Sequence, residues 1–275
     1  MAKGISLHIG LNVVDPAHYD GWSGPLNACE ADVHAMAGIC ATQGFQTRKL
    51  LTRDATRKAI ADQLGELAGT LTSGDTLVIS YSGHGGQLPD ENRDEDDALD
   101  ETWCLYDGQM LDDELYLAWA QFDPGVRVAV FSDSCHSGTV VKNLLLAGGT
   151  GGQAVTGTGT ALHAYRAMPA EMIVRTYYAN QAFYDELLAR PAPPTPACSL
   201  ILVSGCQDNQ LSMDGPFNGA FTGALLQTWS KGSFKGSYNA LAKAVRAKLP
   251  PSQSPNYMTL GGRNDAFEQG QAFAI

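Results

Sequence analysis

Short apolar runs alternate along this chain with stretches whose apolar residues recur at helical spacing, and this alternation constrains the fold most strongly. The runs rich in Ile, Val and Leu are residues 5–11, 45–51, 76–81, 126–131 and 200–203. The stretches with helical spacing are residues 29–40, 57–71, 221–229 and 238–249. Strands that alternate with helices form a largely parallel sheet covered on both faces. We therefore predict an α/β fold with a central sheet of about six mostly parallel strands.

Two segments interrupt this pattern. Residues 148–159 read GGTGGQAVTGTG, which is too rich in glycine to become ordered at low entropic cost, and residues 190–197 read RPAPPTPA, which cannot be regular structure. We predict one domain, residues 1–275, composed of a large part (1–146), a linker (147–196) and a small part (197–275) that completes the same sheet.

The composition excludes several classes of protein. The formal net charge of -11 argues against a nucleic-acid binder, which needs Lys and Arg to displace counterions from phosphates. No segment reads as a signal peptide or a membrane span. The six cysteines are scattered without paired spacing, which indicates reduced thiols and a cytoplasmic protein.

Chemically active side chains follow two of the apolar runs. Residues 76–81 lead into SGHGG, with His84 at its centre, and residues 126–131 lead into SDSCHSG, which contains Cys135. In an open parallel sheet, ligands bind beyond the carboxyl ends of the strands. Two such loops on neighbouring strands would bring His84 and Cys135 together.

A cysteine and a histidine in contact can perform nucleophilic catalysis. The thiolate of Cys135 would attack a carbonyl carbon after His84 takes its proton. The backbone N–H groups of Gly85 and Cys135 would stabilise the oxyanion. Two alternatives remain at this point: His136 as the base, although adjacent side chains usually point apart, and two glycine-rich turns that carry a structural Cys and a structural His.

These residues also resemble a known family. The strings YSGHGG (81–86) and DSCHSG (133–138) are similar to the histidine and cysteine motifs of metacaspases, and further motifs follow in the family's order: LNACEADVHAM (26–36), VSGCQDNQLSMDG (203–215) and NGAFTGALL (218–226). The resemblance implies a caspase-like fold, a monomer, protein or peptide substrates, and a Cys-His dyad that cleaves after Arg or Lys rather than after Asp.

A basic substrate side chain needs a desolvated carboxylate in its pocket. Asp133 lies two residues before Cys135, and by the resemblance Asp32 is the other acid of the pocket. The alternatives are that Asp133 caps a helix or accepts a structural hydrogen bond, and that Asp32 is a solvated residue of the first helix.

Residues 90–101 hold eight carboxylates. Many metacaspases bind calcium in an acidic loop near this position, so the resemblance implies calcium as an activator, with ligands at Asp94, Asp96, Asp97 and Asp100. The alternative is a solvated surface loop. The chain departs from the calcium-dependent pattern after the nucleophile, where it has Val140, Val141 and Lys142 in place of a further acid.

We also predict proteolytic processing of an exposed linker, either by the enzyme itself or by an upstream protease. The candidate residues are Lys142, Arg166, Arg175 and Arg190. The alternative is a long loop that packs over the cleft as a lid.

Three other functions compete with an Arg- or Lys-directed endopeptidase. The chain could be a catalytically silent binding or scaffold module, although both Cys135 and His84 are present. It could be another hydrolase or a transpeptidase that uses Cys-His chemistry. A metal-dependent hydrolase is disfavoured, because only Cys135 and His136 approach the spacing of zinc ligands.

Overall fold

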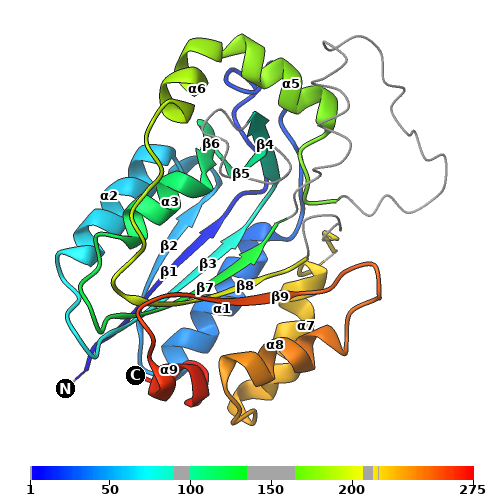
Figure 1. Ribbon diagram of the computed structural model, residues 1–275. Coiled ribbons are helices and arrows are strands. Elements are labelled where there is room, and N and C mark those ends of the chain that lie inside the picture. The colour runs from blue at the N-terminus through cyan, green and yellow to red at the C-terminus, as the bar shows by residue number, and fades with distance from the viewer. Residues whose placement is uncertain (1, 90–98, 135–164, 207–212, 216) are drawn as a thin grey trace.

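A six-stranded sheet forms the centre of the protein (Figure 1). The computed structural model describes residues 2–89, 99–134, 165–206, 213–215 and 217–275. In sheet order the strands are β2 (Gln46–Leu51), β1 (Gly4–Gly10), β3 (Thr76–Ser82), β7 (Arg127–Asp133), β8 (Ser199–Ser204) and β9 (Asn256–Gly261). The first five strands pair in parallel, and β9 pairs with β8 in the antiparallel sense.

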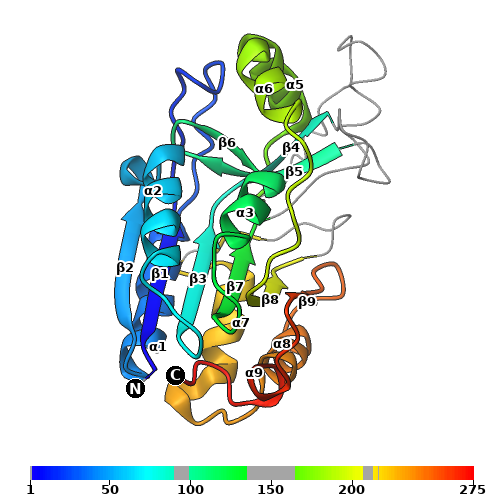
Figure 2. The same ribbon diagram turned by 60° about the vertical axis from the view of Figure 1, so that its left-hand side comes forward.

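Helices cover both faces of this sheet, which gives three layers (Figure 2). One face carries α2 (Arg57–Ala68) and α3 (Asp112–Trp119), and the other carries α1 (Cys29–Thr42), α7 (Ala220–Trp229), α8 (Tyr238–Arg246) and α9 (Asp265–Gln269). Successive strand residues point to opposite faces, so Leu77 and Ile79 pack with the first set of helices and Val78 with the second. Single 3-10 turns occupy Thr52–Asp54 and Ser230–Gly232.

A small antiparallel sheet lies beyond the carboxyl end of the central sheet and is covered by a helical hairpin (Figure 1). Its strands are β4 (Gly85–Pro89), β5 (Leu99–Leu105) and β6 (Gly108–Leu111), and the hairpin consists of α5 (Ala170–Ala179) and α6 (Gln181–Leu188). Leu88 and Leu111 of the small sheet pack against Tyr177 and Tyr184 of the hairpin. This packing buries one face of the hairpin, so the hairpin is docked on the small sheet.

The prediction of an α/β fold with about six mostly parallel strands is confirmed. The expectation that residues 147–196 form a loose connection is wrong for their described part, because α5 and α6 are docked there. The strands β8 and β9 of the small part belong to the same sheet as β1. Within the described ranges, no helix combines the length and the apolar character needed to cross a bilayer.

Candidate active site

The carboxyl ends of β3 and β7 lie side by side, so the two predicted loops begin at neighbouring positions. Ser82 at the end of β3 is paired with Asp133 at the end of β7. His84 lies in the two-residue connection between β3, which ends at Ser82, and β4, which begins at Gly85. Cys135 follows β7 by two residues and lies outside the described residues, as do His136 and Lys142.

His84 is buried and has an oriented ring. Its Nε2 lies 3.0 Å from the carbonyl oxygen of Gly24, and its ring packs at 4.8 Å from that of Trp22. A carbonyl oxygen can only accept, so Nε2 carries the proton and Nδ1 is left as the acceptor. Burial lowers the pKa of His84 to about 4, against the opposing effect of the Gly24 carbonyl. The imidazole is therefore neutral at pH 7 and can take a proton at Nδ1.

Gly24 has to be a glycine for this arrangement. Its φ is +48°, in the left-handed region that side chains disfavour. A Cβ there would also lie 2.7 Å from the Trp22 ring and 3.0 Å from Cδ2 of His84. The close approach of the Gly24 backbone is what fixes the ring of His84.

Asp32 is a buried acid of the first turn of α1, so the alternative that it is solvated is wrong. Its Oδ1 accepts hydrogen bonds from Nδ2 of Asn218 and from N–H of Gly219, at 2.8 and 3.1 Å. Its Oδ2 accepts one from Oγ of Ser82 at 2.8 Å. Burial raises the pKa of this carboxyl, with Arg166 acting in the opposite direction.

Asp133 faces the same space from the end of β7. Its Oδ2 accepts hydrogen bonds from the N–H and from Oγ1 of Thr222, at 3.2 and 2.8 Å. Thr222 lies in the first turn of α7, so this carboxylate caps that helix. The same oxygen lies 2.9 Å from Nη1 of Arg166. Asp133 therefore has both roles: it caps α7, which was the alternative role, and it contacts the guanidinium of Arg166.

A third acid, Asp214, completes the group and was not among the predicted site residues. Its Oδ2 accepts a hydrogen bond from N–H of Asn27 at 2.7 Å, and its Oδ1 accepts one from Nη2 of Arg166 at 2.9 Å. Asp214 is 3% exposed. Three buried carboxylates therefore face one space, which we call the acidic pocket: Asp32, Asp133 and Asp214.

Arg166 occupies the acidic pocket, so the expectation that it lies in an exposed, flexible segment is wrong. Its side chain is 0% exposed. Nη2 donates to Asp32 at 2.7 Å as well as to Asp214, and Nη1 donates to Oγ of Ser82 at 2.7 Å. Burial alone would lower the pKa of Arg166, but the surrounding acids hold it well above its usual value. The guanidinium therefore stays charged.

The other two described processing candidates lie in the helical hairpin. Arg175 is in α5 and half-exposed, with its Nε donating to Oδ2 of Asp20 at 2.7 Å. Arg190 lies just after α6, half-exposed, and its Nη1 is 3.5 Å from Oε1 of Glu114. Neither side chain enters the acidic pocket.

The calcium prediction falls mostly outside the described residues. Asp94, Asp96 and Asp97 lie there, and Asp100 is a buried residue of β5. In the part of the chain that the structure describes, no group of three His, Cys, Asp or Glu residues is placed to hold a metal ion. Calcium activation stays a prediction.

The five described cysteines are free and buried. Burial raises the pKa of Cys29 and Cys40 to about 12 and that of Cys198 to about 11. Burial also raises the pKa of Cys104. A thiol with so high a pKa is a poor nucleophile at neutral pH, so these four cysteines are structural.

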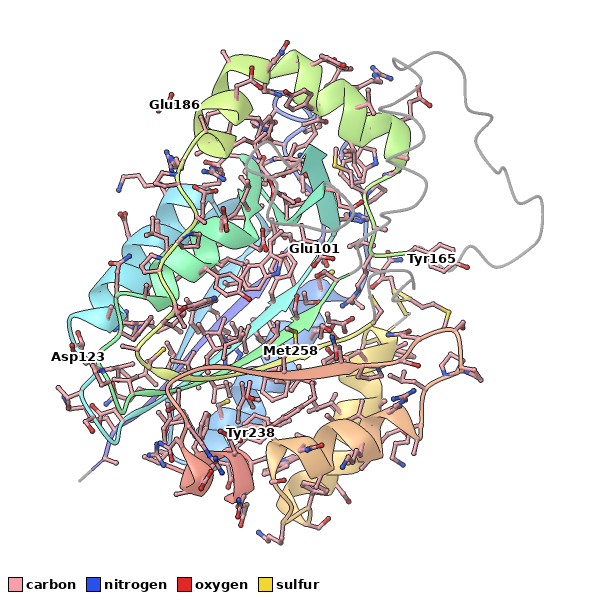
Figure 3. All side chains as sticks on the ribbon, in the orientation of Figure 1. Glu101, Asp123, Tyr165, Glu186, Tyr238 and Met258 are labelled. Carbon is pink, nitrogen blue, oxygen red and sulfur yellow. The ribbon has the colours of Figure 1, made fainter. Side chains whose placement is uncertain are left out.

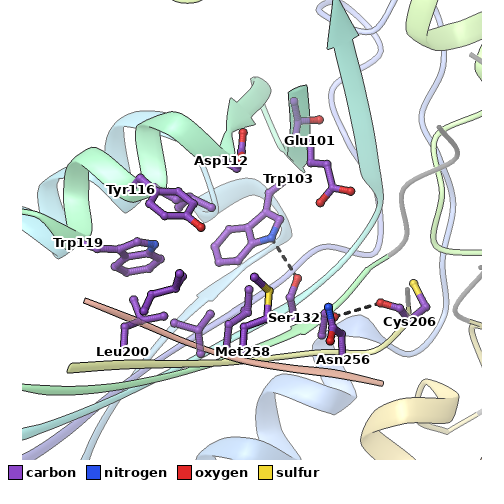
Figure 4. Close-up of a pocket in the computed structure, with 16 residues that line it drawn as sticks. Glu101, Trp103, Asp112, Tyr116, Trp119, Ser132, Leu200, Cys206, Asn256 and Met258 are labelled. Carbon is purple, nitrogen blue, oxygen red and sulfur yellow. Dashed lines mark hydrogen bonds between the residues drawn. The ribbon is translucent and has the colours of Figure 1, made fainter. Parts of the chain in front are cut away.

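A separate cavity of about 120 Å³ lies on the α3 side of the sheet (Figure 4). It is lined mainly by apolar side chains, including Trp103, Trp119, Leu200 and Met258. Ser132, which accepts a hydrogen bond from Nε1 of Trp103, also lines it. Neighbouring residues of a strand point to opposite faces, so this cavity and the acidic pocket lie on opposite sides of β7.

Comparison with known sequences matches this chain to a caspase-domain model and to metacaspases. A model of the caspase domain matches residues 11–267. Metacaspase-1A of Aspergillus clavatus is 30% identical over a region covering 89% of this chain and 62% of that protein. Metacaspase-1 of Lodderomyces elongisporus is 30% identical, covering 80% and 55%. The chain thus spans less than two thirds of the length of these curated relatives.

Two solved structures share the architecture. The crystal structure of protein GSU0716 from Geobacter sulfurreducens has a TM-score of 0.88 at 50% identity, with 99% of each chain covered. Caspase-1 from Spodoptera frugiperda has a TM-score of 0.54 at 12% identity, with 98% of this chain and 92% of that one covered. The second likeness concerns the fold alone, and it confirms the predicted caspase-like fold.

Proposed function

Because the chain belongs to the caspase-domain family of cysteine peptidases, and there resembles the metacaspases, we propose that it is an endopeptidase that cleaves after arginine or lysine. The observation that carries this proposal is the acidic pocket beside His84. Its three buried carboxylates hold a guanidinium in direct contact. A pocket with this charge favours a basic substrate side chain and disfavours aspartate, whose charge it would repel.

In the proposed mechanism, Cys135 is the nucleophile and His84 is its general base. His84 takes the thiol proton at Nδ1, the ring atom without a hydrogen-bond partner among the described residues. The thiolate attacks the carbonyl carbon that follows the basic side chain. The N–H groups of Gly85 and Cys135 stabilise the negative charge on oxygen, and His84 then protonates the leaving amine.

The first experiment compares matched fluorogenic peptides that end in Arg, Lys or Asp, with and without calcium chloride. We expect cleavage of the Arg and Lys peptides, and its loss in Cys135→Ala and His84→Ala. Cleavage that requires calcium would support the predicted activator. Cleavage that survives Cys135→Ala would exclude this nucleophile. If no peptide is cleaved even after the linker is cut at an engineered protease site, the endopeptidase proposal fails and a binding module is favoured.

We further propose that activity is regulated by processing within residues 147–196. The support is that a residue of this segment, Arg166, fills the acidic pocket of the intact chain. A substrate side chain and Arg166 cannot both be bound to the same carboxylates.

A further inference from the structure

We infer that the Arg166–Ala167 peptide bond is the bond at which this enzyme cuts itself, and that Arg166 inhibits the intact chain until the cut is made. This inference rests on the proposed function, because it assigns Arg166 the position of a substrate residue in the same site. It goes further in naming one bond and one inhibitory side chain.

The backbone around Arg166 is held as an extended substrate would be. The carbonyl oxygen of Arg166 accepts a hydrogen bond from N–H of Gly85 at 2.9 Å, and N–H of Met168 donates to the carbonyl oxygen of Gly85 at 2.7 Å. On the N-terminal side of Arg166, Tyr165, which is labelled in Figure 3, forms an antiparallel bridge with Met213. The segment is thus paired with the protein both before and after the bond.

The contact with Gly85 has a chemical meaning beyond pairing. Gly85 is the residue that we predicted as an oxyanion donor, and its N–H points at the carbonyl oxygen that would become negative during attack. On the other side of the bond, Ala167 forms a parallel bridge with Gly85, the residue that follows His84. The leaving nitrogen therefore belongs to a residue next to the group that would protonate it.

The side chain of Arg166 explains why the intact chain would be inactive towards other substrates. It is fully buried, and its two terminal nitrogens contact all three carboxylates of the acidic pocket. A second arginine cannot reach these carboxylates while Arg166 is in place. An inhibitory group attached to the same chain acts at a high effective concentration, on the order of millimolar or above.

The segment after the bond is anchored independently of Arg166. Oη of Tyr184 lies 2.6 Å from Nε2 of His18 and accepts a hydrogen bond from N–H of Gln109 at 3.2 Å. A cut after Arg166 would leave the α5–α6 hairpin docked, and Arg166 would no longer be covalently attached to this hairpin. The arginine could then leave the pocket.

The reaction balances with one water molecule. The thiolate of Cys135 forms a thioester with the carbonyl carbon of Arg166 as the bond to the nitrogen of Ala167 breaks, and that nitrogen takes a proton from His84. Water then adds its oxygen to the same carbon and regenerates the thiol. The products are a chain that ends in the Arg166 carboxylate and a chain that begins with the amine of Ala167.

The decisive measurement is the sequence of the fragments that form when the purified full chain is incubated with and without calcium chloride. We expect fragments 1–166 and 167–275, at a rate independent of protein concentration, and no fragments from Cys135→Ala. Hydrolysis of an Arg peptide should rise in step with the cut. A chain that hydrolyses Arg peptides while this bond stays whole, or is cut first elsewhere, overturns this inference alone. A chain that hydrolyses no Arg peptide and does not cut its own Arg166–Ala167 bond overturns both this inference and the proposed function.

Two variants test the inhibitory role. Arg166→Gln should lose the cut at this bond and should hydrolyse Arg peptides at once, about tenfold or more faster than freshly purified wild type. The matched control Arg175→Gln, on the half-exposed face of α5, should be cut as the wild type is. Thermal unfolding curves would first establish that both proteins are folded. Equal initial rates of Arg-peptide hydrolysis for Arg166→Gln and wild type would then exclude inhibition by Arg166.

Discussion

Oδ1 of Asp214 and Oδ2 of Asp32 accept hydrogen bonds from the same nitrogen, Nη2 of Arg166, at 2.9 and 2.7 Å. The other terminal nitrogen, Nη1, contacts Ser82 and Asp133. The pocket therefore binds the guanidinium at both ends of its planar fork. A lysine ammonium is a compact point charge and cannot span both ends, so this geometry favours arginine over lysine.

Asp214→Asn should lower kcat/KM for Arg peptides by about ten- to hundredfold, because a hydrogen bond to a charged group contributes roughly 1.5–3 kcal/mol. Lys peptides should be affected less. The control Asp62→Asn removes an exposed acid that pairs with Lys58 and should leave both rates unchanged. An equal loss for Arg and Lys peptides would contradict the role of Asp214 in choosing between them.

Gly219→Ala should block the pocket. A Cβ at Gly219 would lie 2.5 Å from Cζ of Arg166 and 2.6 Å from both terminal nitrogens. We expect hydrolysis of Arg peptides and the cut after Arg166 to be lost together. The control Gly223→Ala in α7 meets nothing closer than 3.9 Å, so it should be active and slightly more stable. Normal arginine cleavage by Gly219→Ala would mean that substrates bind elsewhere.

Thr222→Val should raise KM for Arg peptides by roughly three- to tenfold, with a smaller change in kcat. The variant removes the hydroxyl that donates to Asp133 and keeps the N–H that also donates, so the carboxylate is oriented less well. The control Thr228→Val removes a hydroxyl that donates only to the carbonyl of Ala224, within the same helix. Steady-state kinetics that change kcat alone would argue against a positioning role for Thr222.

The stability of the protein should fall in acid partly because of His8. This histidine is buried in β1 beside Oγ of Ser80, and burial lowers its pKa to about 3. The lowered pKa means that His8 contributes stability above its ordinary pKa of 6.5 and that this contribution is lost as the pH falls toward 3.

Urea unfolding at a series of pH values between about 4 and 6.5 measures this effect, with a slope near 1.4 kcal/mol per pH unit for one proton. His8→Gln should have a slope smaller by that amount. His34→Gln replaces an exposed histidine and should keep the wild-type slope. Identical slopes for wild type and His8→Gln would show that His8 is not the group that takes up the proton.

The central strands could be predicted because burial on both faces requires apolar runs, as in β3. The strand β9 lies at the edge of the sheet and is half-exposed, so its sequence, NYMTLG, has no such run. The helices α5 and α6 have apolar residues at helical spacing. They were not predicted because the glycine-rich and proline-rich sequences on either side indicate a linker.

The candidate site was only partly predictable. His84 lies two residues after the last residue of β3, and Asp133 is the last residue of β7, and this position at the end of an apolar run is visible in a sequence. Asp214 lies in a segment with several polar residues, and nothing local distinguishes it from Asp208. Its role depends on the approach of Asn27 and Arg166, which are far away along the chain. The sequence predicts an exposed Arg166, because the burial of this side chain depends on partners that are far away along the chain: Asp32, Ser82, Asp133 and Asp214.

The acidic pocket has a consequence for the cut molecule. Once Arg166 leaves, Asp32, Asp133 and Asp214 lose the guanidinium that neutralised them. Burying several like charges together without a partner is costly, so the emptied site would recruit another cation. Free arginine, small amidines and even buffer amines would then compete with substrates. The choice of buffer would set part of the measured rate.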